Sequence, residues 1–391
     1  MRQNKHHFED TNTINSGPHS SDSGYAHGGN IYEAAQELDI PENKIIDFSA
    51  SINPLGISDR VKDAIKSKMD SLVHYPDPET KILRQVLAEH HGIDTNSIIC
   101  GNGSTELIYL LPRALKPEKV LIPMPTFSEY ERACSLSNAS RVTRYRLQQK
   151  DNYGLKTDEF IAAMRGMIPG NSSLVTRHSS RPCNMAFLCN PNNPTGSVLR
   201  EDEVLEIADA ARSAECMLVI DEAFIDFIPD CSVIEAVAGN PYLIVLRSMT
   251  KFYALTGLRI GYGIIPEHLT DQILEFKEPW TVNSLAQKAA LAALQDNDYN
   301  DRTVKLMREE RIFLENGFND IGIDFIPSAV NYYLLKINEA SSVCRQLKAK
   351  GILVRDCSNF HGLDDSYIRI AVKSRPDNLR LIEELADLCG R

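Results

Sequence analysis

Short apolar runs alternate with helical patterns along most of the chain from about residue 95. The runs are almost continuously apolar, as is typical of strands buried on both faces, and they predict a mostly parallel sheet covered by helices. The stretches between them, such as residues 200–214, are rich in Glu, Ala and Leu and favour helices. The expected strands are residues 97–100, 119–122, 185–189, 217–220, 243–246 and 259–265. This alternation predicts an α/β fold.

The pattern changes after about residue 283, where a long helical stretch begins and extends to residue 317. The segments that follow are a strand over 329–336, a helix over 340–350, strands over 352–355 and 367–372, and a helix over 377–389. They predict a second, smaller α+β domain. The expected parts are a mobile polar tail (1–24), an N-terminal arm with part of the small domain (25–72), a large domain (73–283) and a small C-terminal domain (284–391). The serine-rich segment 166–184 is expected to be a surface loop.

Composition narrows the range of partners. The chain has 391 residues, a formal net charge of -11 and a pI of about 5.5, so it repels nucleic acid and anionic membranes, and we expect neither as a partner. No apolar run approaches the ~20 residues needed to span a bilayer. The first residues are polar and lack the apolar stretch of a signal peptide, which favours a cytoplasmic protein.

The cysteines point to neither a metal site nor a disulfide framework. Nine are spread along the chain, and no CxxC spacing occurs. We therefore expect reduced thiols that serve as small core residues, and no bound metal.

Unusual polar residues follow the expected strands, at the edge where ligands of open α/β sheets bind. Asp221 follows one strand, Lys251 lies shortly after the next, residues 190–196 form an Asn- and Pro-rich turn, and residues 101–106 form a glycine turn before a helix. Taken singly, Asp221 reads as a helix cap, the glycine turn as an ordinary connection and Lys251 as a solvated surface residue. Because all of them follow strands of one sheet, we expect a single site.

Residues 248–262 (SMTKFYALTGLRIGY) resemble the cofactor-lysine segment of class I and II pyridoxal-phosphate aminotransferases. Residues 190–196 and 221–223 fit the same superfamily, and the resemblance extends from His27 to the C-terminus. It implies a fold-type I pyridoxal-phosphate enzyme with a large cofactor-binding domain. Within the superfamily the chain is similar to histidinol-phosphate aminotransferases. It is more similar to threonine-phosphate decarboxylases of cobalamin biosynthesis, on residues 27–31, 47–56 and 221–229.

The resemblance implies a role for each matching residue. Lys251 would hold pyridoxal 5'-phosphate as a Schiff base and relay protons, and Asp221 would keep the pyridine nitrogen protonated. Asn193 would bind the ring oxygen and Phe127 would stack on the ring. Tyr75 would reach the phosphate bound by a neighbouring subunit, which implies a homodimer with shared active sites. The implied phosphate ligands are Ser104, Thr105, Ser248, Thr250 and Arg259, with Ser104 and Thr105 contributing their amides at a helix N-terminus.

One position departs from the aminotransferase pattern. Three residues after Asp221 those enzymes usually have a tyrosine that donates its hydroxyl to the ring oxygen, whereas this chain has Phe224. Without that donor, the imine at Lys251 should keep its proton to a higher pH. Phe224 also occurs in the threonine-phosphate decarboxylase pattern, which favours that subgroup.

The arginines decide between the reactions that the resemblance allows. Arg355 and Arg369 lie on neighbouring expected strands and could clamp a substrate phosphate, and His27, Asn53 and Asn193 could add to the pocket. For Arg355 a surface ion pair is the alternative. A clamp on the distal phosphate leaves the α-carboxylate free to leave as CO2, whereas a clamp on that carboxylate favours transamination.

The expected reaction is therefore decarboxylation of L-threonine O-3-phosphate to (R)-1-aminopropan-2-yl phosphate and CO2. Transamination of histidinol phosphate or a similar phosphorylated amine is the alternative. Decarboxylation of L-serine O-phosphate differs by one methyl group, and the sequence leaves it open. A catalytically inactive regulator remains a third class, although intact Lys251 and Asp221 argue against it.

Overall fold

The computed structural model describes residues 27–137, 141–167, 182–388 and 390. The expected tail over 1–24 and most of the expected loop over 166–184 lie outside the described residues. Within those ranges, every helix is too short or too polar to cross a bilayer.

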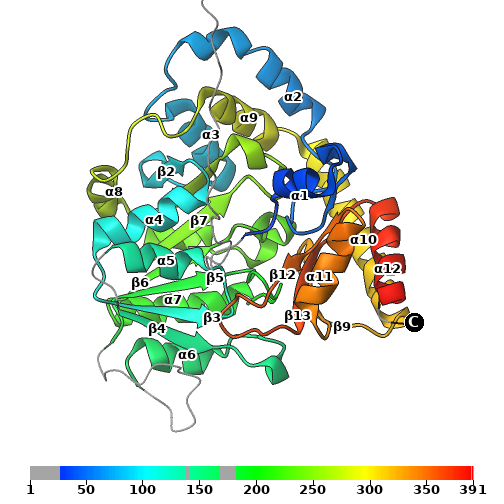
Figure 1. The fold of residues 1–391 in the computed structure, drawn as a ribbon. Helices are drawn as coiled ribbons and strands as arrows, with labels where there is room; N and C mark the ends of the chain where they lie inside the picture. Colours follow the sequence, from blue (N-terminus) through cyan, green and yellow to red (C-terminus); the bar gives the residue numbers. More distant parts are fainter. Residues whose placement is uncertain (1–26, 138–140, 168–181, 389, 391) are drawn as a thin grey trace, which may run out of the picture.

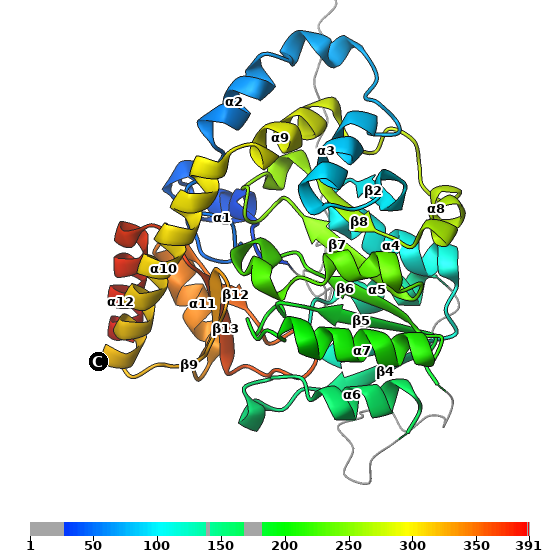
Figure 2. The ribbon, with the colours of Figure 1, turned by 180° about the vertical axis from the view of Figure 1, so that it is seen from behind.

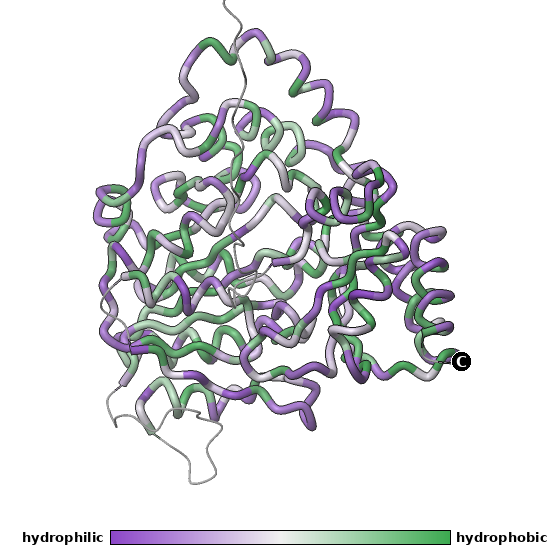
Figure 3. The backbone as a smooth tube through the Cα atoms, in the orientation of Figure 1, coloured by the Kyte–Doolittle hydropathy of each residue, from purple (hydrophilic) through white to green (hydrophobic). Residues whose placement is uncertain are grey.

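A seven-stranded sheet forms the centre of the larger part of the molecule (Figure 1). Its order is β2 (Ile98–Gly101), β8 (Gly261–Ile264), β7 (Leu243–Ser248), β6 (Met217–Asp221), β5 (Met185–Cys189), β3 (Lys119–Met124) and β4 (Arg141–Arg146). Only β8 is antiparallel to its neighbours, β2 and β7. The expected α/β fold with a mostly parallel sheet is confirmed, and all six expected strands belong to it. Their apolar residues appear as the green interior of Figure 3.

The sequence did not predict β4, which lies at the edge of the sheet and pairs only with β3. Its residues, Arg141 to Arg146, alternate between exposed and buried positions. An edge strand keeps one face in solvent, so it lacks the continuous apolar run that marks the central strands.

Two hydrophobic cores cover the two faces of this sheet. One contains residues of α3 (Lys81–His91), α6 (Thr157–Met164), α7 (Glu201–Ser213) and α9 (Ser284–Leu294). The other contains residues of α4 (Ser104–Leu115), α5 (Glu129–Leu136) and α8 (Glu267–Leu274). Alternate residues of each central strand belong to opposite cores, as in β6, where Leu218 and Val219 pack into different ones.

A four-stranded antiparallel sheet forms the smaller part, in the order β12 (Arg355–Asp356), β13 (Tyr367–Ala371), β10 (Tyr332–Lys336) and β9 (Asp324–Ile326). The helices packed on it are α10 (Asn297–Asp320), α11 (Ala340–Ala349) and α12 (Arg375–Leu388), seen beside it in Figures 1 and 2. The expected long helix over 284–317 is in fact two helices, because α9 ends at Leu294 and Asp296 caps α10.

The N-terminal segment packs on this smaller part. After α1 (Ile31–Leu38), β1 (Ile46–Asp47) pairs in parallel with β11 (Ile352–Leu353), and Phe48 is fully buried in the smaller core. The chain then passes through α2 (Asp59–Lys66) to the large sheet. The expected domain boundaries stay a prediction.

Short 3-10 helices occur at Glu42–Lys44, Met69–Val73, Thr95–Ser97, Gln149–Asp151, Ile225–Phe227, Pro229–Cys231, Ile234–Gly239 and Thr256–Leu258.

Candidate active site

A cavity of about 600 Å³ lies where the carboxyl ends of β5, β6 and β7 meet the N-terminal segment and the smaller sheet. Its size suits a small organic ligand. The predicted site residues that line it are His27, Ser104, Thr105, Phe127, Asn193, Asp221, Ser248, Thr250, Lys251, Arg259, Arg355 and Arg369. Residues from distant parts of the sequence therefore meet in one place.

Two predicted residues lie elsewhere. Asn53 does not line the cavity: its amide donates to Phe252 O (2.8 Å) and Thr303 Oγ1 (2.7 Å), and its Oδ1 accepts from a backbone N–H. Because those bonds occupy its side chain, the structure does not support a role in substrate binding, which stays a prediction. Its backbone N–H instead donates to Lys251 O (3.1 Å) and so holds the lysine loop. Tyr75 is 82% exposed and packs against Trp280, with ring centroids 5.1 Å apart.

Lys251 follows β7 and is partly buried. Among the described residues its Nζ makes no hydrogen bond or ion pair, and it lies 5.9 Å from the centre of the Phe224 ring. Burial lowers the pKa of this amine to about 8, and the positive charges of Arg369 and Arg259 act in the same direction. About a tenth of the amine is therefore neutral and nucleophilic at pH 7, far more than for an ordinary lysine.

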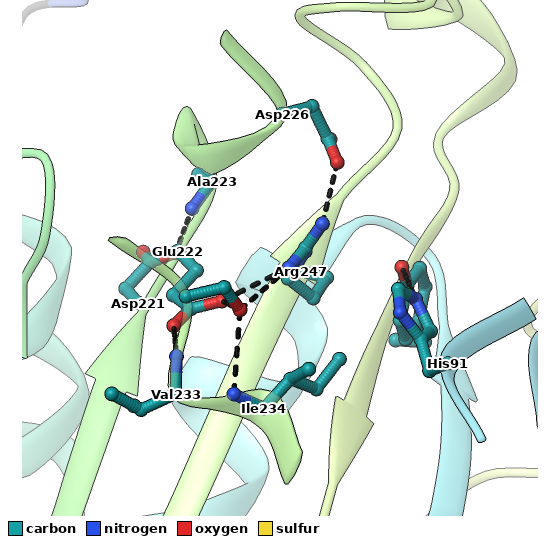
Figure 4. Close-up of polar contacts among 10 residues, drawn as sticks. His91, Asp221, Glu222, Ala223, Asp226, Val233, Ile234 and Arg247 are labelled. Carbon is teal, nitrogen blue, oxygen red and sulfur yellow. Dashed lines mark hydrogen bonds and ion pairs between the residues drawn. The ribbon is translucent and has the colours of Figure 1, made fainter. Parts of the chain in front are cut away.

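Asp221 ends β6 and is 3% exposed. Its Oδ2 accepts a hydrogen bond from Tyr130 Oη (2.7 Å), and its Oδ1 accepts one from the backbone of Ala223 (3.1 Å; Figure 4). Burial raises the pKa of this carboxyl to about 6, although the bond from Tyr130 opposes the shift. Such a carboxyl gains from a cationic partner in the cavity.

Several groups that favour an anion surround the start of α4. The first residues of this twelve-residue helix are Ser104 and Thr105, whose N–H groups have no partner within the helix. The hydroxyls of Ser248 and Thr250 lie 2.8 Å apart beside them in the same cavity. Gly103 has φ +75°, and a Cβ there would lie 2.6 Å from Arg259 Nη2. Only glycine therefore lets the guanidinium approach the helix start.

Arg355 and Arg369 are direct partners across β12 and β13, and they are 9% and 7% exposed. Arg369 donates to Asn193 Oδ1 and to Ser49 O (2.8 Å), and Arg355 donates to Asn359 Oδ1 (2.7 Å). Among the described residues no carboxylate forms an ion pair with either one. The surface ion pair considered for Arg355 is therefore excluded. Arg355 and Arg369 are two buried, charged guanidinium groups that line the cavity without an anionic partner among the described residues.

Some residues at the cavity were not predicted from the sequence. Glu129 is 4% exposed, and its Oε1 lies 3.0 Å from His27 Nε2. Its Oε2 accepts a hydrogen bond from the Tyr109 hydroxyl. Tyr130 supports Asp221, and Ser51 Oγ is buried without a partner among the described residues. A Glu-Tyr pair just after the turn that contains Phe127 was the only local sign of the first two.

Phe224 is 4% exposed and packs edge-on against Tyr332, with centroids 4.9 Å apart. The Tyr332 hydroxyl does not replace the one that Phe224 lacks, because it donates to Asn192 O (2.8 Å). Tyr332 therefore does not compensate for the hydroxyl that is lost where this chain has Phe224 in place of the usual tyrosine.

Comparisons with known proteins agree with this fold. The aminotransferase class I and II model matches residues 43–385. A threonine-phosphate decarboxylase of Salmonella typhimurium is 38% identical over 93% of this chain and 96% of its own. A histidinol-phosphate aminotransferase of Carboxydothermus hydrogenoformans is 34% identical over 92% and 95%. The structure of L-threonine-O-3-phosphate decarboxylase from Porphyromonas gingivalis superposes with a TM-score of 0.75 at 26% identity, covering 89% of this chain and 100% of that one. The chain thus belongs to the class I and II aminotransferase family.

Proposed function

We propose that this chain is a pyridoxal-phosphate-dependent decarboxylase. It would convert L-threonine O-3-phosphate to (R)-1-aminopropan-2-yl phosphate and CO2, a carboxy-lyase reaction of cobalamin biosynthesis. The observation that carries the proposal is the pair Arg355 and Arg369, buried side by side at the cavity without a carboxylate partner among the described residues. Two such groups match a dianionic phosphate bidentately.

The residues present fit pyridoxal phosphate. The helix N-terminus at Ser104, the hydroxyls of Ser248 and Thr250, and Arg259 form a cradle for its phosphate, and the close approach permitted by Gly103 supports this role. Lys251 would bind it covalently. Asp221 would pair with its ring nitrogen, Asn193 would bind its ring oxygen and Phe127 would stack on its ring.

When bound, pyridoxal phosphate supplies an electron sink for the electron pair left on the substrate carbon as CO2 departs. Asp221, ionised beside a cationic ring nitrogen, would hold the proton on that nitrogen. The lowered pKa of Lys251, about 8, lets Nζ exist as the free amine and then accept and return a proton. The proton returned from Nζ would replace the carboxylate on the substrate carbon, which balances the reaction.

The choice between decarboxylation and transamination depends on which substrate group the arginines hold. If Arg355 and Arg369 bind the distal phosphate, with His27 beside them, the carboxylate is not tied to a guanidinium and can leave. If Arg369 instead binds the α-carboxylate, as transamination of an amino acid such as glutamate requires, the carboxylate is retained. Histidinol phosphate carries a phosphate but no carboxylate, and the product assay below distinguishes it. The presence of Arg355 directly opposite Arg369 favours the phosphate, because two guanidinium groups exceed the need of a monoanion.

We also propose a homodimer with shared sites. Tyr75 is 82% exposed and packs against the exposed Trp280, and further exposed apolar side chains lie near it in the sequence: Met69, Leu72, Val73 and Ile82. A monomer rarely leaves such a patch in water, and a second subunit would cover it. The eight described cysteines are free thiols, most of them buried, and this suits the reducing cytoplasm where we propose that the enzyme acts.

The test is a product assay with purified enzyme and added pyridoxal phosphate. Threonine phosphate, serine phosphate and histidinol phosphate are each incubated with 2-oxoglutarate and compared for CO2 release and for glutamate formation, which reports transamination. We expect CO2 from threonine phosphate and no glutamate. Glutamate formation from histidinol phosphate without CO2 release from the other two substrates would refute the proposal in favour of the transaminase.

A further inference from the structure

Behind the cavity lies a buried cluster of charged residues that the proposed chemistry does not use (Figure 4). Arg247 Nη1 donates to Glu222 Oε2 (3.0 Å), and Arg247 Nη2 donates to Asp226 Oδ1 (2.5 Å). The side chains of Arg247 and Glu222 are 6% and 0% exposed. Glu222 also accepts from the Ser232 hydroxyl (2.7 Å) and from the backbone of Val233 (2.9 Å). We call Glu222, Asp226 and Arg247 the arginine cluster.

The arginine cluster lies on the face of the sheet opposite to the cofactor residues. Arg247 and Ser248 are consecutive on β7, and successive side chains of a strand point to opposite faces. Glu222 directly follows β6 and bonds to Arg247. Asp221 and Ser248 line the cavity, whereas Glu222 and Arg247 do not. Direct contact of the cluster with the cofactor is therefore excluded, and any influence must pass through the backbone.

The cluster joins the two segments that carry the main cofactor residues. Glu222 and Asp226 lie at the two ends of the turn that follows Asp221, and this turn contributes Ala223 and Phe224 to the cavity. Arg247 lies on β7, four residues before Lys251. The Arg247 guanidinium thus binds both ends of this turn and connects them to β7, the strand that leads to Lys251. The backbone bond from Glu222 N to Leu246 O (2.8 Å) fixes the same register.

Neighbouring groups cannot take over the role of Arg247. Tyr262, its partner on β8, bonds to His91 Nε2 (2.8 Å), and burial lowers the pKa of His91 to about 3, so this histidine is uncharged. Among the described residues, Arg247 is the cation that forms ion pairs with Glu222 and Asp226, so its removal would leave both carboxylates unpaired. Uncompensated buried carboxylates would push the turn away from its present position.

We propose that Glu222, Asp226 and Arg247 are positioning residues, which hold Asp221 and Phe224 in register with Lys251 and thereby fix the orientation of the bound cofactor. This inference rests on the proposed function only as far as cofactor binding at Lys251. No substrate is needed to test it.

The test uses the visible circular dichroism of the bound cofactor, which reports its fixed, asymmetric orientation, together with the cofactor dissociation constant and thermal unfolding. Glu222→Gln keeps the size of the side chain and removes its charge. We expect the visible dichroism per bound cofactor to fall at least about twofold and the dissociation constant to rise roughly tenfold, the scale of a weakened bond to a buried charge. Arg247→Lys keeps the charge and should restore part of the signal lost in an Arg247→Met variant.

Glu310→Gln is the matched control. Glu310 is 3% exposed and accepts from Arg375 Nε (3.0 Å) and Asn378 Nδ2 (2.9 Å), but it lies on α10 and does not line the cavity. This variant should lose thermal stability while its dichroism and cofactor affinity stay unchanged. If Glu222→Gln behaves in the same way, the cluster is merely structural and the inference is overturned.

Two outcomes separate the possible failures. A wild-type protein without a visible band in the presence of pyridoxal phosphate would contradict the proposed function itself. A normal wild-type band that Glu222→Gln leaves unaltered would contradict only the positioning role. If Glu222→Gln does not fold, Asp226→Asn replaces it, because its side chain is partly accessible and its amide oxygen can still accept from Arg247. An unaltered dichroism in folded Asp226→Asn would then overturn the inference.

Discussion

Arg355→Ala tests whether the two arginines hold a phosphate. In the structure Arg355 uses one donor on Asn359, and the other guanidinium donors have no protein acceptor among the described residues. A bound phosphate would accept one or two of them. Each charge-assisted bond contributes about 1.5–3 kcal/mol. Loss of one bond corresponds to roughly 10- to 150-fold in affinity.

The assay measures binding of L-threonine O-3-phosphate and of L-threonine to wild type and mutant, from the change in visible absorbance of the bound cofactor before turnover. We expect Arg355→Ala to weaken phosphothreonine at least about tenfold and threonine by no more than about twofold. The exposed Arg302→Ala, whose arginine pairs with Asp298 on the surface of α10, serves as the control and should affect neither ligand.

Equal losses for the two ligands would refute the phosphate role. Both carry an α-carboxylate, so equal losses would mean that Arg355 acts on that group, as a transaminase clamp does. An unchanged affinity for phosphothreonine would mean that Arg369 and the other cavity groups suffice for the phosphate.

Three further predictions concern the cofactor residues. Lys251→Ala should abolish turnover and the visible band that borohydride traps, and a band that survives removal of free cofactor would contradict the assignment. Asp221→Asn should keep bound cofactor but lose most activity, as an activity assay and absorbance would report. Burial raises the pKa of Asp221 from 3.8 to about 6. Ionisation of this carboxyl therefore lowers the stability of the cofactor-free protein as the pH rises from about 4 to about 6. Asp221→Asn should therefore stabilise that form by up to about 3 kcal/mol at pH 7, with the gain vanishing below about pH 4; thermal unfolding at both pH values decides it. Phe224→Tyr should lower the pH midpoint of the cofactor spectrum by supplying a hydroxyl, and an unchanged or higher midpoint would argue against this role.

The sequence predicted those parts of the fold that depend on local pattern. The central strands, buried on both faces, stood out as apolar runs, whereas β4 did not, because its Arg-rich residues alternate at an exposed edge. Lys251 and Asp221 stood out because they lie at or shortly after the ends of such strands, and the resemblance of residues 248–262 and 221–223 then implied their roles. The meeting of strand ends at one edge then predicted the cavity.

Contacts between residues far apart in sequence could not be predicted in this way. Tyr130 lies 91 residues from Asp221, and Arg247 lies 25 residues from Glu222, so no local period marks either pair. Asn53 is the converse case. Its sequence context matched that of a site residue, but its amide is used to hold Phe252 and Thr303 in place.

The pairing of β1 with β11 has a consequence for how the enzyme is made. Phe48 N donates to Leu353 O (2.7 Å), Ala371 N donates to Phe48 O (2.8 Å) and Arg369 Nη2 donates to Ser49 O (2.8 Å). During synthesis, residues 46–49 can therefore reach these partners only after more than 300 further residues have been added. Such non-local contacts form late in folding, and the arm stays exposed until then. The cavity residues of the N-terminal arm therefore cannot meet Arg355 and Arg369 until the segment that contains these arginines has been made.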